Sequence, residues 1–204
     1  MSRPELRANA YIFDFDGTLA SIPVNWDQVK VELREVLGTK EELQSVFPTI
    51  VRLMKGDPKV RDRAFAIIDE YEERALPEAF IFPGSFDLLE LLSQNSKVSL
   101  VTMQGPKAVD ALLRRFELKQ FLLRRFTRED ATNREEQVRL ALASMRVQKD
   151  DAIFVADRLH DLNTAKSIGV RFVMIRTHGD DPAEDDVPVF HSIEEFLSAI
   201  RALP

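Results

Sequence analysis

Short apolar runs that stop at a polar residue, separated by stretches of helical periodicity, constrain the fold of this 204-residue chain more than any other feature. The first run stops at Asp14, the second at Thr102 and the third at Asp157. Alternating strands and helices are typical of a doubly wound, Rossmann-like sheet whose strands are mostly parallel. We therefore predict an α/β fold with strands at 10–13, 98–101, 152–156 and 171–175, and helices at 85–92, 107–116, 134–145, 162–168 and 192–202.

The interval 21–82 breaks this alternation, because it has helical periodicity and no convincing strand. Polar residues that can cap a helix occur three times within it. They are Asn25 before a helix at 26–37, Thr39 before a helix that Pro48 interrupts or restarts, and Asp57 before a helix that Pro58 opens. We predict an inserted small α-helical cap domain at 21–82 and a core domain made of 1–20 and 83–204.

Composition excludes several classes of function. The chain has no cysteine, so disulfides, thiolate catalysis and thiolate metal sites are absent. A net charge of -6 argues against general affinity for nucleic acids or anionic membranes. We interpret the arginines at 114–128 as a solvated helix face and the flank of a strand. Residues 1–9 are too polar for a signal peptide and no apolar run could cross a bilayer, so we expect a cytoplasmic protein.

Acidic and hydroxyl side chains follow the expected strands. In open α/β sheets the ligand site lies beyond the carboxyl ends of the strands, so Asp14, Asp16, Thr102 and Asp157 should converge there. Three carboxylates that converge repel one another unless a cation neutralises them. A hard divalent cation with oxygen ligands suits such a site, and the sequence therefore predicts Mg²⁺.

The run from Asp14 to Leu19, Asp-Phe-Asp-Gly-Thr-Leu, resembles the signature of the haloacid dehalogenase superfamily. The resemblance continues at Thr102 and at Asp157-Arg158-Leu159-His160-Asp161, followed by Ala165 and Gly169, and it covers nearly the whole chain. Within the superfamily, the chain resembles the phosphoglycolate-phosphatase-like group, which carries a helical cap. The resemblance implies a phosphatase that acts on a small phosphorylated metabolite.

The resemblance also implies roles for individual residues. Asp14 would attack phosphorus, while Asp16 would protonate the leaving group and then activate water. Asp14, the backbone carbonyl of Asp16 and Asp157 would hold Mg²⁺, with Asp161 at or next to the ion. Four further residues would bind the phosphate group of the substrate: Thr18, Thr102, Met103 and Lys107.

The chain departs from the family pattern at the third motif, which is usually a lysine. The corresponding stretch, 127–137, contains Arg134 and no lysine. Arginine keeps the positive charge, but its planar fork differs from a compact ammonium. Arg134 is thus one candidate for the catalytic cation, and Lys107 on the helix after Thr102 is the other.

Asp16 distinguishes this chain from dehalogenases, which resemble it but lack the second aspartate because a leaving halide needs no proton.

Two alternatives to a phosphatase stay open. A phosphomutase would use the same aspartyl phosphate. A non-catalytic phosphate-binding protein could keep the fold of the family without its activity. Either a monomer or a small homo-oligomer is compatible with the sequence.

Overall fold

The central sheet of the computed structural model has six strands, and every pair of neighbours is parallel. The structure describes residues 6–54, 56–176 and 187–203. The strand order is β5-β4-β1-β6-β7-β8. The bounds are β1 Ala10–Phe13, β4 Lys97–Val101, β5 Arg124–Phe126, β6 Ala152–Ala156, β7 Arg171–Ile175 and β8 Val189–Phe190. The predicted doubly wound α/β fold is confirmed.

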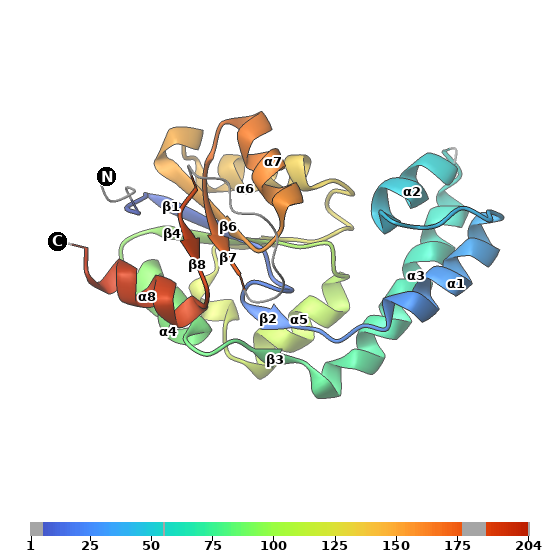
Figure 1. Ribbon diagram of the computed structural model, residues 1–204, viewed down its shortest axis with the longest axis horizontal. Coiled ribbons are helices and arrows are strands. Elements are labelled where there is room, and N and C mark those ends of the chain that lie inside the picture. The colour runs from blue at the N-terminus through green and yellow to red at the C-terminus, as the bar shows by residue number, and fades with distance from the viewer. Residues whose placement is uncertain (1–5, 55, 177–186, 204) are drawn as a thin grey trace.

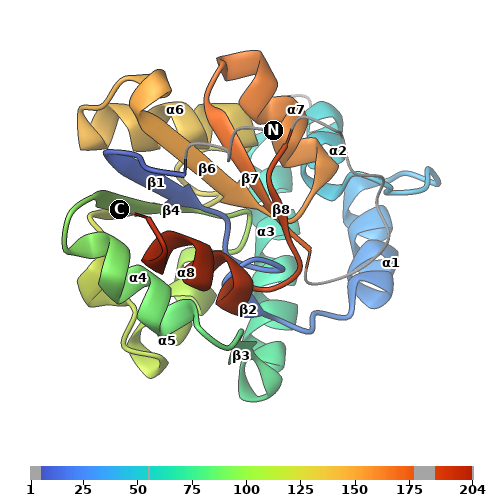
Figure 2. The same ribbon diagram turned by 60° about the vertical axis from the view of Figure 1, so that its left-hand side comes forward.

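Helices cover both faces of this sheet (Figure 2). Alternate residues of β1 belong to different hydrophobic clusters: Tyr11 and Phe13 pack on one face, and Ala10 and Ile12 on the other. Because successive side chains of a strand point to opposite faces, a strand buried on both faces is apolar throughout. The first face is covered by α4 Ser85–Ser93, α5 Pro106–Arg115 and α8 Ile193–Arg201, and the second by α6 Arg134–Met145 and α7 Leu159–Ile168.

Three helices form a separate helical unit beside the core (Figure 1). They are α1 Trp26–Leu37, α2 Val46–Leu53 and α3 Pro58–Ala75. Their apolar faces pack around a hydrophobic cluster of their own, which includes Val29, Leu33, Ile50 and Ile68. A two-stranded antiparallel ladder, β2 Ala20–Ser21 with β3 Phe80–Ile81, joins the chain that enters the unit to the chain that leaves it.

Local sequence rules explain where the helices of this unit begin and end. The Asn25 side chain accepts a hydrogen bond from the backbone of Gln28, and Asp57 caps α3 in the same way. Gly38 ends α1 with φ 60°, a left-handed conformation that glycine adopts at little cost. One expectation is wrong: Thr39 does not start a helix, and its hydroxyl instead accepts a hydrogen bond from the backbone of Glu41.

The short strands β2, β3, β5 and β8 were not expected from the sequence. Each has only two or three residues, which is too short for an alternating pattern to emerge. Their pairing depends on neighbours far away in the sequence. The acidic segment at 180–186 lies outside the described residues. In the part of the chain that is described, no helix combines the length and the apolar character needed to cross a bilayer.

Truncating the core of the helical unit should destabilise the protein. Leu33 on α1 is fully buried, whereas Val31 on the same helix is half exposed. We expect Leu33→Ala to lower the free energy of unfolding by about 2–5 kcal/mol, because it leaves a cavity. Val31→Ala should change it by less than about 0.5 kcal/mol. Urea denaturation of both variants measures the free energy of unfolding. Equal losses in the two variants would contradict the burial of Leu33 in the core of the helical unit.

Candidate active site

Strand order and register bring the predicted strand-end residues together. The central strand β1 lies between β4 and β6, with Phe13 level with Leu100 and with Val155. Asp14 therefore follows β1 between the ends of its two neighbours, which continue into Thr102 and Asp157. The site lies at the carboxyl end of the sheet, as expected for an open α/β fold.

Three buried carboxylates form the centre of the site. One oxygen each from Asp14, Asp157 and Asp161 can be chosen so that all lie within 4.8 Å of one another. Asp161 comes from the first turn of α7, where the helix dipole favours a negative charge. Hard oxygen donors at this spacing fit a divalent cation such as Mg²⁺.

Arg134 supplies positive charge to this acidic cluster. Its guanidinium lies 2.8 Å from an oxygen of Asp14 and 2.9 Å from an oxygen of Asp161. Arg134 is the first residue of α6, and Asn133 caps that helix by accepting a hydrogen bond from the backbone of Glu136. Of the two cations considered from the sequence, Arg134 is therefore the one that contacts the acids.

Burial and charge shift the acidity of these groups. Burial raises the pKa of Asp14 well above its ordinary value, with Arg134 opposing the shift and the neighbouring carboxylates adding to it. Burial also raises the pKa of Asp157 to about 6. Burial would lower the pKa of Arg134, but Asp14 and Asp161 outweigh it and the pKa is raised. A bound cation would relieve the repulsion that these shifts express.

Gly17 permits the close approach of the first loop to Asp157. Its φ of 88° lies in the left-handed region. A Cβ atom at this position would lie 2.3 Å from Oδ2 of Asp157, so a side chain would collide with the carboxylate. The glycine of the first motif is thus required by conformation and by space.

Asp16 lies between two hydrogen-bond donors at the edge of the cluster. The backbone N–H of Ile22 donates to Oδ1 of Asp16 at 2.8 Å, and the side-chain amide of Gln104 donates to Oδ2 at 3.3 Å. Gln104 also accepts a hydrogen bond from the hydroxyl of Thr102. One amide side chain therefore joins the expected acid/base residue to the expected phosphate-binding threonine.

Two predicted phosphate-binding residues have other partners in the structure. The side chain of Lys107 is 72% exposed and lies 3.5 Å from Glu73 of α3, so the structure does not bring it to the acidic cluster. The hydroxyl of Thr18 donates to Asp157 at 3.5 Å and so supports an acid of the cluster. The sequence could not show either partner, because both contacts depend on tertiary packing.

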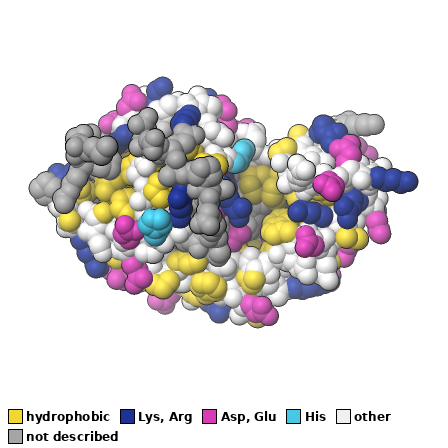
Figure 3. Space-filling model, viewed as in Figure 1, with side chains coloured by type: hydrophobic (Ala, Val, Ile, Leu, Met, Phe, Trp, Pro, Cys, Tyr) yellow, Lys and Arg dark blue, Asp and Glu magenta, His cyan; other side chains and the backbone are white. Residues whose placement is uncertain are grey.

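A cavity of about 450 Å³ opens beside the cluster, between the helical unit and the core. Figure 3 shows the surface hollowed between these two parts of the molecule. Ser45, Val46, Phe47 and Pro48 line it from the helical unit. From the core come Met103, Thr132, Asn133, Arg134, Glu135, Arg158, His160, Asp161 and Thr164. Met103, one of the predicted phosphate-binding residues, thus lines this cavity.

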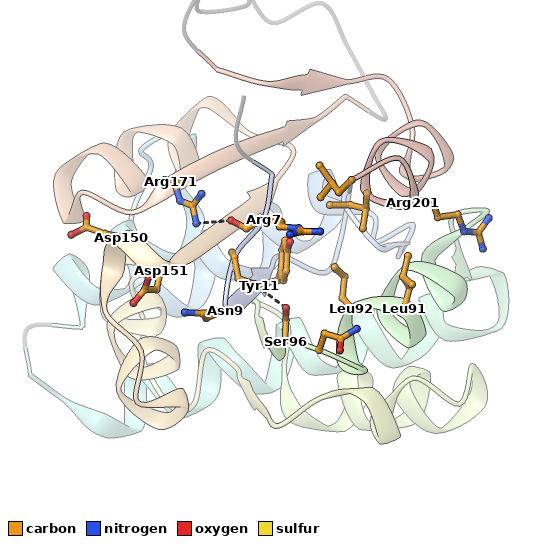
Figure 4. Close-up of a pocket in the computed structure, with 14 residues that line it drawn as sticks. Arg7, Asn9, Tyr11, Leu91, Leu92, Ser96, Asp150, Asp151, Arg171 and Arg201 are labelled. Carbon is orange, nitrogen blue, oxygen red and sulfur yellow. Dashed lines mark hydrogen bonds between the residues drawn. The ribbon is translucent and has the colours of Figure 1, made fainter. Parts of the chain in front are cut away.

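Figure 4 shows a larger cavity, of about 850 Å³, whose lining does not include Asp14, Asp157 or Asp161. It is lined by residues at the amino ends of strands, such as Asn9 before β1 and Arg171 at the start of β7. This is the opposite end of the sheet from Asp14. Arg171 donates a hydrogen bond to the backbone carbonyl of Arg7 there. Size alone therefore does not identify the reactive site.

Sequence reasoning missed two amides that support the site. Gln104 is buried beside Thr102, and Gln137 donates to the backbone carbonyl of Thr102 at 2.8 Å. Gln137 also accepts a hydrogen bond from Arg134. Its position three residues after Arg134 on α6 places both side chains on one helix face, so helical spacing could have indicated it.

The sheet is doubly wound, and acidic side chains from its strand ends and from α7 cluster at one edge. The family model described as haloacid dehalogenase-like hydrolase matches residues 11–175. The chain belongs to this family. The match includes the Asp14 loop, Thr102, Arg134 and Asp161, and it therefore covers the whole candidate site.

A curated relative and several solved structures are similar to the chain. A haloacid dehalogenase-like hydrolase domain-containing protein of Arabidopsis thaliana is 31% identical over 119 residues, which are 55% of this chain and 47% of the relative. The matched region thus spans about half of that relative's length.

Three similar solved structures come from bacteria. A haloacid dehalogenase-like family hydrolase of Streptococcus pneumoniae has a TM-score of 0.69 at 19% identity, with 95% of this chain and 98% of that chain covered. CbbY of Rhodobacter sphaeroides, in complex with phosphate, has a TM-score of 0.68 at 20% identity, with coverage of 93% and 96%. A predicted phosphatase of Clostridium acetobutylicum has a TM-score of 0.69 at 19% identity, with coverage of 97% and 100%. At these identities the likeness shows the fold.

Replacing Gly17 should cost more stability than replacing another left-handed glycine. Gly38 has φ 60°, and no atom lies within 4 Å of the point that a Cβ would occupy, so Gly38→Ala should cost about 1–2 kcal/mol from backbone strain alone. Gly17→Ala adds the collision with Asp157, and overpacking costs about 1–3 kcal/mol more. Denaturant unfolding of the two variants checks this difference. Equal losses would mean that the first loop can move away from Asp157.

Proposed function

We propose that the chain is a Mg²⁺-dependent phosphatase that hydrolyses a small phosphorylated metabolite through an aspartyl phosphate on Asp14. The observation that carries this proposal is the contact of Arg134 with both Asp14 and Asp161 inside the buried acidic cluster. That contact supplies the cation that the third motif needs. It also argues against a non-catalytic phosphate-binding protein, because such a protein would not need a cation beside Asp14.

In the first step an oxygen of Asp14 attacks phosphorus as the bond from phosphorus to the leaving oxygen breaks. Asp16 gives its proton to that oxygen, which departs as an alcohol. Arg134 lies against Asp14 and offsets negative charge that the approaching phosphate would otherwise meet. When substrate binds, the hydroxyl of Thr102 would turn its hydrogen from Gln104 to a phosphate oxygen. Fixing the carboxylate in line with the leaving oxygen is the main contribution of the fold.

In the second step a water molecule attacks phosphorus and gives a proton to Asp16. The bond between phosphorus and the Asp14 oxygen breaks, which restores the carboxylate and releases inorganic phosphate. Ile22 and Gln104 hold the two oxygens of Asp16, which fixes the orientation of the carboxyl group for both proton transfers. The cycle returns every residue to its starting state.

Asp14, the backbone carbonyl of Asp16 and Asp157 would hold Mg²⁺, with Asp161 adjacent to it. When bound, the cation neutralises the charge that develops on the phosphoryl oxygens. The donor set consists of oxygens and the acids are buried, which is the combination that a hard cation requires. Thr18 would keep Asp157 oriented through its hydrogen bond.

The helical unit would act as a cap over the reacting groups. Its segment 45–48 faces Arg134 and Asp161 across the cavity, so it can exclude water and contact the leaving group. A volume of about 450 Å³ is suited to a small metabolite. Arg158 and His160 line the core side of this cavity and would offer polar contacts to the metabolite.

Relatives support this proposal at the level of the fold. CbbY was solved with phosphate, and the protein from Clostridium acetobutylicum is described as a predicted phosphatase. A similar backbone thus binds phosphate, although a fold hosts many substrates.

Purified protein should hydrolyse p-nitrophenyl phosphate or a phosphorylated metabolite only when Mg²⁺ is present. EDTA should abolish turnover, and Asp14→Asn should lower kcat by at least about 10³-fold because an amide is a poor nucleophile. Asp150→Asn makes the same change at an exposed position and should leave kcat unaltered. Phosphate release is measured by a colorimetric assay.

The outcome separates the alternatives. Turnover that survives in Asp14→Asn would contradict the aspartyl-phosphate mechanism. Transfer of phosphate to a second substrate position, without release, would identify a phosphomutase. Binding of phosphate and Mg²⁺ without turnover on a broad panel of metabolites would identify a non-catalytic binding protein.

Arg134 should be required for rate because it lies against the nucleophile. Arg134→Gln keeps a polar side chain but removes the charge, and we expect kcat to fall about 10²–10³-fold. Arg134→Lys should retain more activity than Arg134→Gln, since an ammonium preserves the charge but cannot reproduce the fork between Asp14 and Asp161. Steady-state kinetics of both variants tests this order, and equal kcat values in the two would contradict a role based on charge.

A further inference from the structure

Arg128 is a fully buried arginine outside the acidic cluster. It follows β5 in a turn in which the backbone and hydroxyl of Thr127 both donate to Asp130, at 2.8 and 3.0 Å. Arg128 lies on the flank of a strand, as expected from the sequence, but the burial of its side chain was not predicted. A buried guanidinium requires partners that match its charge and its donors.

The partners of Arg128 come from the helical unit. Its guanidinium lies 2.7 Å from Glu72 and forms an ion pair with Asp69, one turn earlier on α3. The group also lies over the ring of Phe65, 5.3 Å from the ring centre. Glu72 is as fully buried as Arg128. The base of the helical unit is thus attached to the core by buried charges.

The same residues hold the loop that follows Thr102. The guanidinium of Arg128 donates to the carbonyl of Met103 at 3.1 Å, and its backbone N–H donates to the carbonyl of Gln104 at 3.5 Å. The second oxygen of Glu72 accepts a hydrogen bond from the backbone N–H of Gly105 at 2.9 Å. These contacts fix the backbone of the loop 103–105 at each of its three residues.

Gly105 gives independent evidence that this contact is close. A Cβ atom there would lie 2.3 Å from an oxygen of Asp69 and 2.6 Å from a nitrogen of Arg128. The backbone of Gly105 has φ -71°, so the glycine is not needed for an unusual conformation. It is needed because the ion pair lies directly against the chain.

The loop 103–105 connects Glu72 and Arg128 to Thr102 and Asp16. The backbone of Gln104 donates to the hydroxyl of Thr102 at 3.2 Å, and its side chain donates to Asp16. We propose that Glu72 and Arg128 are positioning residues through which the helical unit holds the loop 103–105 so that Gln104 orients Thr102 and Asp16. This inference rests on the proposed phosphatase function.

Attachment of the helical unit alone would not require a buried ion pair. Removing two charges from water is costly, and apolar residues of similar size often replace a buried pair without loss of stability. Exposed contacts also join α3 and its end to the core, between Lys107 and Glu73 and between Arg115 and the carbonyl of Leu76. What apolar residues cannot supply is an acceptor for Gly105 and a donor for Met103.

The test compares Glu72→Gln with Glu73→Gln, the same change one residue along α3 at an exposed ion pair. The first readout is amide hydrogen exchange of residues 102–109 in the full chain without ligand. Glutamine has one acceptor oxygen for the two donors that Glu72 serves, and the charged guanidinium of Arg128 competes for it with the backbone N–H of Gly105. We therefore expect exchange at Gly105 to rise about tenfold in Glu72→Gln, the factor that corresponds to one lost hydrogen bond, and to stay unchanged in Glu73→Gln. Unchanged exchange in Glu72→Gln would overturn the proposal.

The second readout is a double-mutant cycle on kcat for p-nitrophenyl phosphate with Mg²⁺. Glu72→Gln should lower kcat about tenfold in the natural chain but less than about twofold in a Gln104→Ala background, because its effect passes through Gln104. Equal factors in both backgrounds would overturn the proposal. If the natural chain turns over no phosphoester, the phosphatase proposal fails, and the ligand-free exchange measurement still decides the positioning role.

A third variant separates positioning from stability. The double change Glu72→Met with Arg128→Met removes both charges and keeps similar volumes, so we expect an unfolding midpoint near that of the natural chain. Exchange at Gly105 should nevertheless be fast and kcat low. Recovery of natural exchange and kcat in this variant would mean that the pair only attaches the helical unit.

Discussion

The structure depends on how the mutual repulsion of Asp14, Asp157 and Asp161 is compensated. Two unit charges about 4 Å apart interact by about 4 kcal/mol at an effective dielectric constant of about 20, so three buried carboxylates would disperse or take up protons if nothing opposed them. Arg134 lies against two of the three and reduces this cost. The first motif can therefore persist in a folded chain before any cation binds, and the raised pKa values of Asp14 and Asp157 reflect their burial together with the repulsion that is left.

This compensation depends on the order of the strands and on the helices that cover one face of the sheet. Asp14 and Asp157 meet because β1 and β6 are parallel neighbours that end at the same edge. Arg134 and Asp161 meet them because α6 and α7 cover the same face of the sheet and begin near that edge. Apolar packing on that face thus sets the distances between charged groups at its end, and a shift of either helix would separate a cation from its acids.

The sequence predicted those residues whose position depends on a strand end, and missed those whose position depends on packing between elements. Asp14, Thr102 and Asp157 follow apolar runs, so parallel pairing alone brings them together. Arg134 and Lys107 could not be separated, because the choice depends on which helix face meets the acids. The burial of Arg128 on the flank of its strand was not predicted, because charged residues usually face solvent and nothing local indicated that α3 would bring Asp69 and Glu72 over it.

Arg134 and Arg128 solve the same electrostatic problem at two places. Each guanidinium lies between two carboxylates, Asp14 and Asp161 in one case and Asp69 and Glu72 in the other. A planar fork can serve two acceptors at fixed angles, which a single ammonium cannot do with the same rigidity. Arginine at the third motif is therefore consistent with a site in which geometry is held by forked contacts. Because Thr102 and Gln104 lie between the two arginines along the chain of hydrogen bonds, rigidity at the base of the helical unit and rigidity at Asp14 support each other.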